Sequence, residues 1–209
     1  MLEIIRYESS LLMSNMYVVT EDNHAVIIDP FSNSNVFDGL IIDYIFLTHE
    51  HYDHISGVNA LKDTYDAPVI CSKACAANIE NPRKNMSCYF KEFCELQNWI
   101  KINQIPKYEN NYKCKANLVF DDKLMIDWLG HQWSLFALPG HSMGSICIIL
   151  DSGYCFSGDS VLENIVTECR LPGGSRKLWK EISIPRLKEL PKGIHICPGH
   201  FESFIYSGT

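Results

Sequence analysis

The stretch His49-Glu50-His51-Tyr52-Asp53-His54 indicates both the fold and the chemistry of this chain. It places three histidines and an aspartate within six residues, immediately after the apolar run 41–47 (I-I-D-Y-I-F-L). That run is too short for a typical helix and contains β-branched residues, so we expect a buried strand. Apolar residues then recur at helical spacing (Ile55, Val58 and Leu61), which predicts a helix beginning beside the cluster. Such a turn would hold the polar side chains at the rim of a sheet.

The composition of this cluster indicates a metal site. A single histidine at a strand end is most often a structural residue. Three histidines interleaved with a carboxylate are different, because burying so many titratable groups without a counter-ion is costly. Imidazole and carboxylate ligands together suit Zn, Fe, Mn or Ni better than Ca or Mg. The residue types therefore predict a transition-metal centre with further ligands at other strand ends.

One arrangement recurs three times downstream: a short apolar run, a glycine, and then a histidine or an aspartate. Residues 134–138 lead into P-G-H-S, residues 154–156 into S-G-D, and residues 194–197 into P-G-H. Glycine lets the backbone bend sharply and approach an ion closely. The apolar run 146–150 predicts one more strand. The candidate ligands at the three turns are His141, Asp159 and His200.

Five motifs carry a family resemblance: T-H-E-H-Y-D-H-I-S-G (48–57), P-G-H-S-M-G-S (139–145), F-S-G-D-S (156–160), L-P-G-G-S (171–175) and C-P-G-H (197–200). Together they resemble the metallo-β-lactamase-fold hydrolases of the glyoxalase II-like group. The N-terminal segments S-N-M-Y-V-V (14–19) and A-V-I-I-D-P (25–30) also resemble the opening hairpin of that family. The resemblance implies an α/β fold, a four-layer αββα sandwich, built as a single domain over residues 1–209.

The resemblance also implies a dinuclear zinc centre, with Fe or Mn as other possible metals. Carried over residue by residue, it implies that one metal is held by His49, His51 and His141, that a second is held by Asp53, His54 and His200, and that Asp159 bridges both.

The implied activity is hydrolysis of a small thioester or ester by a hydroxide that bridges the two metals. Asp53 is the candidate for orienting that hydroxide. A thiolate leaves easily, so a thioester needs little help from a general acid, whereas an amide would need a proton donor that the sequence does not identify. The expected partner is therefore a small-molecule thioester or ester.

Composition agrees with a cytoplasmic enzyme. The chain has 209 residues, 46% of them hydrophobic, which suffices for one domain with a core. Nine scattered cysteines without a C-x-x-C pair predict reduced thiols. A formal charge of −7 argues against binding to nucleic acid. We also expect no membrane segment and no signal peptide, because no apolar run approaches the necessary length.

Residues 82–117 depart from the family pattern and are a candidate lid insertion. Tyr89, Phe93, Leu96 and then Trp99 or Ile100 fall at helical spacing. This spacing is typical of an ordinary amphipathic helix packed on the core. The alternative is a lid over the metals that shapes substrate choice.

Other departures concern the loops near the predicted site. Glu168 and Arg170 exchange the acidic and basic positions that relatives commonly show, and Phe31 and Phe201 stand where glycine is usual. The chain also ends soon after the last histidine, where glyoxalase II proper continues with basic contacts to glutathione. We therefore expect poor use of hydroxyacylglutathione. His24, His131 and His195 are expected to be structural or solvated.

Four alternatives remain open at this point. Persulfide dioxygenases share the fold and much of the motif but use a single iron. Flavodiiron proteins are disfavoured, because their pattern places Glu where this chain has His51 and they carry an added flavin domain. A nuclease of the same superfamily is disfavoured by the acidic charge. A non-catalytic binding protein is disfavoured because all seven candidate ligands are present.

Overall fold

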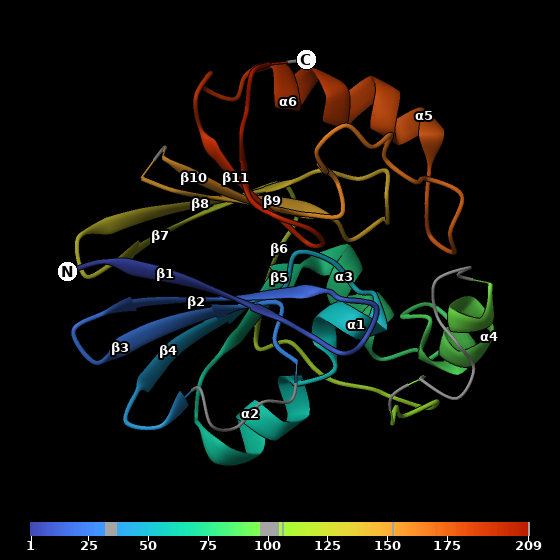
Figure 1. Cartoon of the computed structure of the whole chain (residues 1–209), viewed down its shortest axis with the longest axis horizontal. Helices are drawn as coiled ribbons and strands as arrows, with labels where there is room; N and C mark the ends of the chain where they lie inside the picture. Colours follow the sequence, from blue (N-terminus) through green and yellow to red (C-terminus); the bar gives the residue numbers. More distant parts are fainter. Residues whose placement is uncertain (32–36, 97–104, 106, 152, 209) are drawn as a thin grey trace.

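Two six-stranded sheets face each other in the computed structural model, which describes residues 1–31, 37–96, 105, 107–151 and 153–208 (Figure 1). The first sheet has the order β1-β2-β3-β4-β5-β6. Its first three strands pair antiparallel, and β3 to β6 pair parallel. Its strands are β1 (Glu3–Glu8), β2 (Asn15–Glu21), β3 (His24–Ile28), β4 (Ile41–Phe46), β5 (Val69–Ser72) and β6 (Leu118–Phe120).

The second sheet has the order β12-β11-β10-β9-β8-β7. Only β10 and β11 pair parallel in it, and the other neighbours pair antiparallel. Its strands are β7 (Lys123–Trp128), β8 (His131–Ala137), β9 (Ile146–Leu150), β10 (Tyr154–Gly158), β11 (His195–Pro198) and β12 (Phe204–Ile205).

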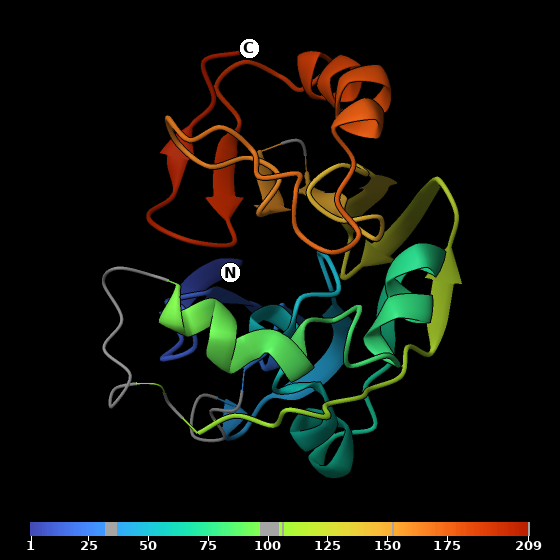
Figure 2. The same ribbon diagram turned by 90° about the vertical axis from the view of Figure 1, so that its right-hand side faces the viewer.

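The helices lie outside the two sheets, which gives four layers (Figure 1). Figure 2 shows α4, in light green, on the side of the molecule below the C-terminal strands. The helices on the first sheet's side are α1 (Tyr52–Ile55), α2 (Val58–Thr64), α3 (Lys73–Ile79), the 3-10 turn η2 (Ser87–Tyr89) and α4 (Phe90–Glu95); those on the second are α5 (Arg176–Leu178), the π-helical turn η4 (Trp179–Ser183) and α6 (Ile184–Lys188).

Three separate apolar clusters hold these layers together. The cluster between the sheets contains Trp133, whose ring packs edge-on against Phe46 at a centroid distance of 5.3 Å. A second cluster joins the first sheet to its helices and includes Ile55. A third includes Leu187 of α6 and joins the second sheet to the helices above it. The predicted αββα sandwich is therefore confirmed.

The predicted strands are present, with ends shifted by a few residues. The helix predicted over Ile55 to Leu61 is instead two short helices separated at Gly57. A Cβ atom at Gly57 would lie 2.4 Å from the backbone carbonyl carbon of Phe31, so the two segments meet where only glycine fits. Ser72 caps α3, because its hydroxyl accepts a hydrogen bond from the Cys75 amide at 3.1 Å.

The predicted packing face of the helix in the candidate insertion is wrong at two of its three described positions, since only Phe93 is half-buried. Tyr89 and Leu96 are 43% and 79% exposed, whereas Phe90 and Cys94 are buried. The chain enters α4 through the turn η2, which rotates the apolar face by one position relative to the predicted stripe. Positions 99 and 100 lie outside the described residues. Among the residues described, no helix is long and apolar enough to cross a membrane.

Candidate metal centre

All seven predicted ligands lie at the ends of strands, on one rim of the two sheets. His49 and His51 follow β4, and Asp53 and His54 belong to α1. The other three follow strands of the second sheet: His141 comes after β8, Asp159 after β10 and His200 after β11. The structure thus brings together residues that are up to 151 positions apart in the sequence, since the span runs from position 49 to position 200.

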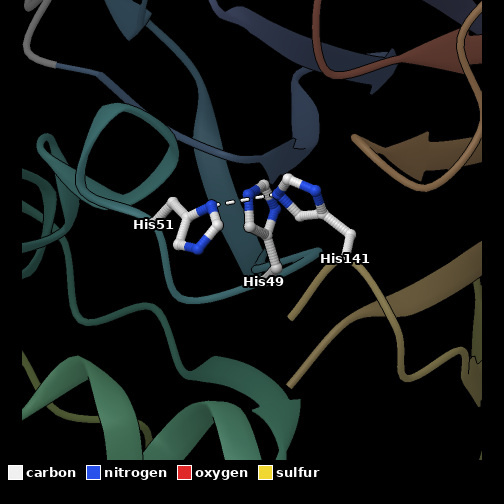
Figure 3. Close-up of side chains that lie close together, drawn as sticks. All are labelled: His49, His51 and His141. Carbon is white, nitrogen blue, oxygen red and sulfur yellow. Dashed lines mark hydrogen bonds between the residues drawn. The ribbon is translucent and has the colours of Figure 1, made fainter. Parts of the chain in front are cut away.

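The first group consists of His49, His51 and His141, all buried (Figure 3). The Nδ1 atom of His51 lies 3.0 Å from the Nε2 atom of His141, and the His49 ring stands between these two side chains in the view. The Nε2 atom of His49 is buried without a hydrogen-bond partner. Buried imidazole nitrogens that face one another without partners are what a shared cation would satisfy.

The second group consists of Asp53, His54 and His200. The Nε2 atoms of the two histidines are 3.3 Å apart, and the Oδ2 atom of Asp53 lies 3.4 Å from one and 3.5 Å from the other. Two nitrogens and a carboxylate oxygen therefore converge on one point.

Asp159 lies between the two groups. Its Oδ2 atom is 3.6 Å from the Nε2 atom of His141, which belongs to the first group, and 3.4 Å from the Nε2 atom of His200 in the second. Its Oδ1 atom is 3.4 Å from the Nε2 atom of His54. A carboxylate in this position can contact cations in both groups, as the sequence predicts.

The protonation states of the two groups differ, and those of the first group favour a cation. Burial and then the neighbouring His54 hold the pKa of His49 well below its usual range, and burial and then His141 lower the pKa of His51 to about 3. Both rings are thus neutral at pH 7 and offer lone pairs. Burial opposes ionisation of Asp159, but His200 and His54 outweigh it and hold its pKa well below the usual value. In the second group, burial opposes protonation of His200, but Asp159 outweighs it and raises the His200 pKa to about 10, so a cation there has to replace a proton.

The orientation of two imidazoles depends on Asp29, a role that the sequence did not reveal. Its carboxylate accepts hydrogen bonds from the amide and the hydroxyl of Thr48, and that hydroxyl lies 3.0 Å from Nδ1 of His49. Its Oδ2 atom also lies 3.3 Å from Nδ1 of His54. These contacts point the Nε2 atoms of both rings toward the site. Asp29 was visible only as part of the A-V-I-I-D-P segment.

The His141 ring is oriented by a backbone group. Its Nδ1 atom lies 2.9 Å from the carbonyl oxygen of Glu168, a contact that side-chain patterns cannot predict. Glu50 is fully buried and supports the same loop, since Ser142 Oγ and Asn78 Nδ2 each donate to its carboxylate at 2.7 Å. Burial raises the Glu50 pKa.

The side chains of the remaining singled-out residues lie apart from the cluster. Glu168 and Arg170 bond to each other, with Arg170 Nε donating to the carboxylate at 2.8 Å, so the exchanged charges form a local pair. His24 lies 2.9 Å from the carboxylate of Asp43, and His131 bonds to two acidic side chains. His195 packs against the ring of Tyr154 in the second sheet.

A cavity of about 490 Å³ opens beside the cluster. Four of its lining residues are candidate ligands, so any compound in the cavity would lie against the metal centre. The other lining residues are apolar or aromatic: Leu12, Met13, Tyr52, Met86, Phe90, Phe93, Leu171 and Phe201.

These features agree with comparisons to known proteins. Residues 10–200 match the model of the metallo-beta-lactamase superfamily, and the chain belongs to that superfamily. It is 25% identical over 208 residues to a probable metallo-hydrolase of Streptococcus pyogenes serotype M6, covering 96% of this chain and 84% of the relative. It is also 26% identical over 198 residues to a hydroxyacylglutathione hydrolase of Salmonella typhi. That match covers 88% of this chain but only 61% of the Salmonella enzyme.

Solved structures give the same result. The B3 metallo-beta-lactamase BLEG-1 superposes with a TM-score of 0.77 at 24% identity, covering 97% of this chain and 94% of that one. TTHA1623 in a di-iron-bound form superposes with a TM-score of 0.70 at 26% identity, covering 96% and 94%. The predicted family and fold are therefore confirmed.

Proposed function

We propose that this chain, folded as a single domain over residues 1–209, is a dinuclear metal hydrolase that cleaves a small thioester or ester. The observation that carries the proposal is the position of Asp159, within 3.6 Å of one histidine of the first group and of two histidines of the second. The first group offers three imidazoles and the second offers two imidazoles and a carboxylate, a donor set that suits zinc, iron or manganese.

The chain's own residues would act as follows. His49, His51 and His141 would hold one cation, Asp53, His54 and His200 would hold the other, and Asp159 would be shared between the two groups. Two divalent cations bound there supply a water of lowered pKa and polarise a substrate carbonyl.

Asp53 lines the cavity and is the residue placed to orient the attacking water. Apolar side chains make up the rest of the described lining and would surround the substrate near its carbonyl. A thiolate leaves without a proton donor, so cleavage of a thioester needs no further acidic side chain. This fits the described lining, in which the carboxylates, Asp53 and Asp159, are both candidate ligands.

The test is metal analysis of protein purified without added metal, followed by hydrolysis assays with small thioesters. We expect about two zinc ions per chain, loss of activity on chelation, and recovery on adding zinc back. About one iron per chain with no thioester hydrolysis would favour the dioxygenase alternative. Two tightly bound metals with no hydrolysis of thioesters or esters would refute the substrate class.

A further inference from the structure

The cavity wall has an unusual backbone. Among the described residues, nine that are not glycine have a positive φ angle. Four of the nine are Asp or Asn, the residue types that adopt this conformation most readily. The other five are large apolar residues, and four of these five line the cavity: Leu12, Met13, Met86 and Phe201.

Left-handed backbone is strained for such side chains, and it persists only where neighbouring contacts enforce it. At Phe201, with a φ of +67°, the carbonyl oxygen accepts hydrogen bonds from Asn15 Nδ2 at 2.7 Å and from Arg6 Nη1 at 3.1 Å. Arg6 also pairs with Glu202, the next residue. These contacts fix the backbone at a position where glycine would fit without strain.

The turn at Leu12 and Met13 is fixed in a similar way. The amide of Ser9 donates to the Ser14 carbonyl at 2.8 Å, and the Ser14 hydroxyl donates to the Asp53 carbonyl at 2.9 Å. The second bond ties the turn to the backbone of a candidate ligand.

Packing explains the large side chains of Met86, which is 8% exposed, and of Leu12, which packs against the cluster of the first sheet and its helices, but not those of Phe201 and Met13. Phe201 is 53% exposed and Met13 is 39% exposed, so neither belongs to the core. Both instead present apolar surface to a cavity whose described lining contains no lysine or arginine. Backbone strain that is concentrated at a cavity and is not offset by core packing indicates that these side chains are kept for binding a ligand.

We propose that this wall binds an apolar acyl or aryl group of the substrate, and that Phe201 and Met13 determine its specificity. The inference rests on the proposed hydrolase function. The cavity volume of about 490 Å³ suits such a group with the scissile carbonyl at the metal centre. The carboxylates of a glutathione thioester would find no lysine or arginine among the described lining residues.

The first experiment measures kcat/KM for acetyl, butyryl, hexanoyl, octanoyl and benzoyl thioesters of one uncharged thiol. We expect kcat/KM to rise about fourfold for each added CH₂ until the cavity is filled. Phe201→Gly and Met13→Gly should each reduce the ratio of kcat/KM for octanoyl to kcat/KM for acetyl by about tenfold. Equal rates across the acyl series in the wild type would overturn the inference.

The matched control is Leu129→Gly. Leu129 also has a positive φ, +54°, and is 51% exposed, but it lies outside the cavity in the turn between β7 and β8. All three variants should shift the unfolding midpoint alike, because each relieves the same backbone strain, and Leu129→Gly should keep the wild-type selectivity. A much larger loss of stability in Phe201→Gly and Met13→Gly would show that these side chains serve packing and would overturn the inference.

A second readout does not depend on catalysis. Calorimetric binding of methyl ketones from 2-butanone to 2-decanone, in which carbon replaces the thioester sulfur, should show affinity rising with chain length, and Phe201→Gly should flatten that rise. If no thioester is cleaved but the ketones bind in this way, the proposed reaction fails and the apolar site stands. If thioesters are cleaved but ketone affinity does not depend on length, the reaction stands and the inference fails.

Discussion

Glycine at the strand ends determines how closely the candidate ligands approach one another. A Cβ atom at Gly199, directly before His200, would lie 2.2 Å from the Oδ1 atom of Asp159 and 2.9 Å from a carbon of the His54 ring. Neither partner can move freely, because both side chains are largely buried and contact other members of the cluster. One methyl group at this position would therefore push apart residues of both metal groups.

Gly199→Ala is predicted to lower both metal content and thioester hydrolysis by at least about tenfold, since displaced ligands of this kind cost metal affinity. The measurements are elemental analysis and kcat/KM. Gly153→Ala is the control, because a Cβ atom there meets nothing within 4 Å. Wild-type metal content in Gly199→Ala would show that the cluster tolerates the intrusion and does not need this close approach.

Asp159→Ala is predicted to reduce the affinity for both metals and to lower activity by at least about a hundredfold, because one carboxylate contacts both groups. His24→Ala should change neither quantity, since His24 pairs with Asp43 at 2.9 Å outside the site. Metal titration with kinetics distinguishes the two variants. Two tightly held metals and full turnover in Asp159→Ala would contradict the bridging assignment.

At the scale of elements, the sequence predicted the presence of buried strands well and one helix face poorly. Strands such as β9 (Ile146–Leu150) were predictable because a buried strand is a short apolar run. The buried face of α4 was not predictable. Apolar residues occur both in α4 and in the turn before it, so their spacing alone does not show where the helix begins. Contacts such as His141 with the Glu168 carbonyl were unpredictable for another reason: a backbone acceptor leaves no mark in the residue types.

The corrected face of α4 can be tested by its stability. Phe90 is 3% exposed and packs edge-on against Tyr52 at a centroid distance of 5.3 Å, so Phe90→Ala should lower the free energy of unfolding by about 3–5 kcal/mol. Leu96→Ala should change it by less than about 0.5 kcal/mol, because Leu96 is 79% exposed. Chemical denaturation measures both, and the reverse ranking would restore the face predicted from spacing.

At the scale of the whole molecule, His131 joins the two sheets at the edge away from the metal centre. It begins β8, its Nε2 atom lies 2.7 Å from the carboxylate of Glu21 in β2, and its Nδ1 atom bonds to Asp151 after β9. Hydrogen bonds to Asp151 and then Glu21 outweigh burial and hold the His131 pKa above its usual value.

This raised pKa makes the junction pH-dependent. Protonated His131 contributes stability that is fully present below its unfolded pKa of about 6.5 and is lost as the pH rises through the raised value. Between pH 6 and pH 9, we expect the free energy of unfolding to fall by up to about 1 kcal/mol more in the wild type than in His131→Gln. This upper bound is the usual contribution of a partly exposed ion pair. Thermal denaturation of both proteins at the two pH values measures this, and parallel curves would contradict it.

Much of the architecture could be predicted from the sequence because strand-end glycines and polar residues mark the sheet rim directly. The seven candidate ligands were predictable for the same reason, and the structure places them together. The orienting role of Asp29 was not, because it depends on a left-handed turn with a φ of +53° that directs its carboxylate toward Thr48 and His54. Part of the cavity wall was predictable, because Phe93 of the candidate lid segment lines the cavity. The rest was not, because Leu12, Met13 and Phe201 come from loops that are distant in sequence.

The candidate ligands come from both halves of the chain, with His49 to His54 following the first sheet and His141, Asp159 and His200 following the second. A cation bound to both sets would act as a cross-link between the two sheets at a rim where no covalent bond joins them. Its binding free energy would then add to the folding free energy, about 2.7 kcal/mol when free metal is at a hundred times its dissociation constant. The thermal midpoint of unfolding would thus depend on the concentration of free metal. When metal is scarce, a larger fraction of the chain would be unfolded and open to proteolysis.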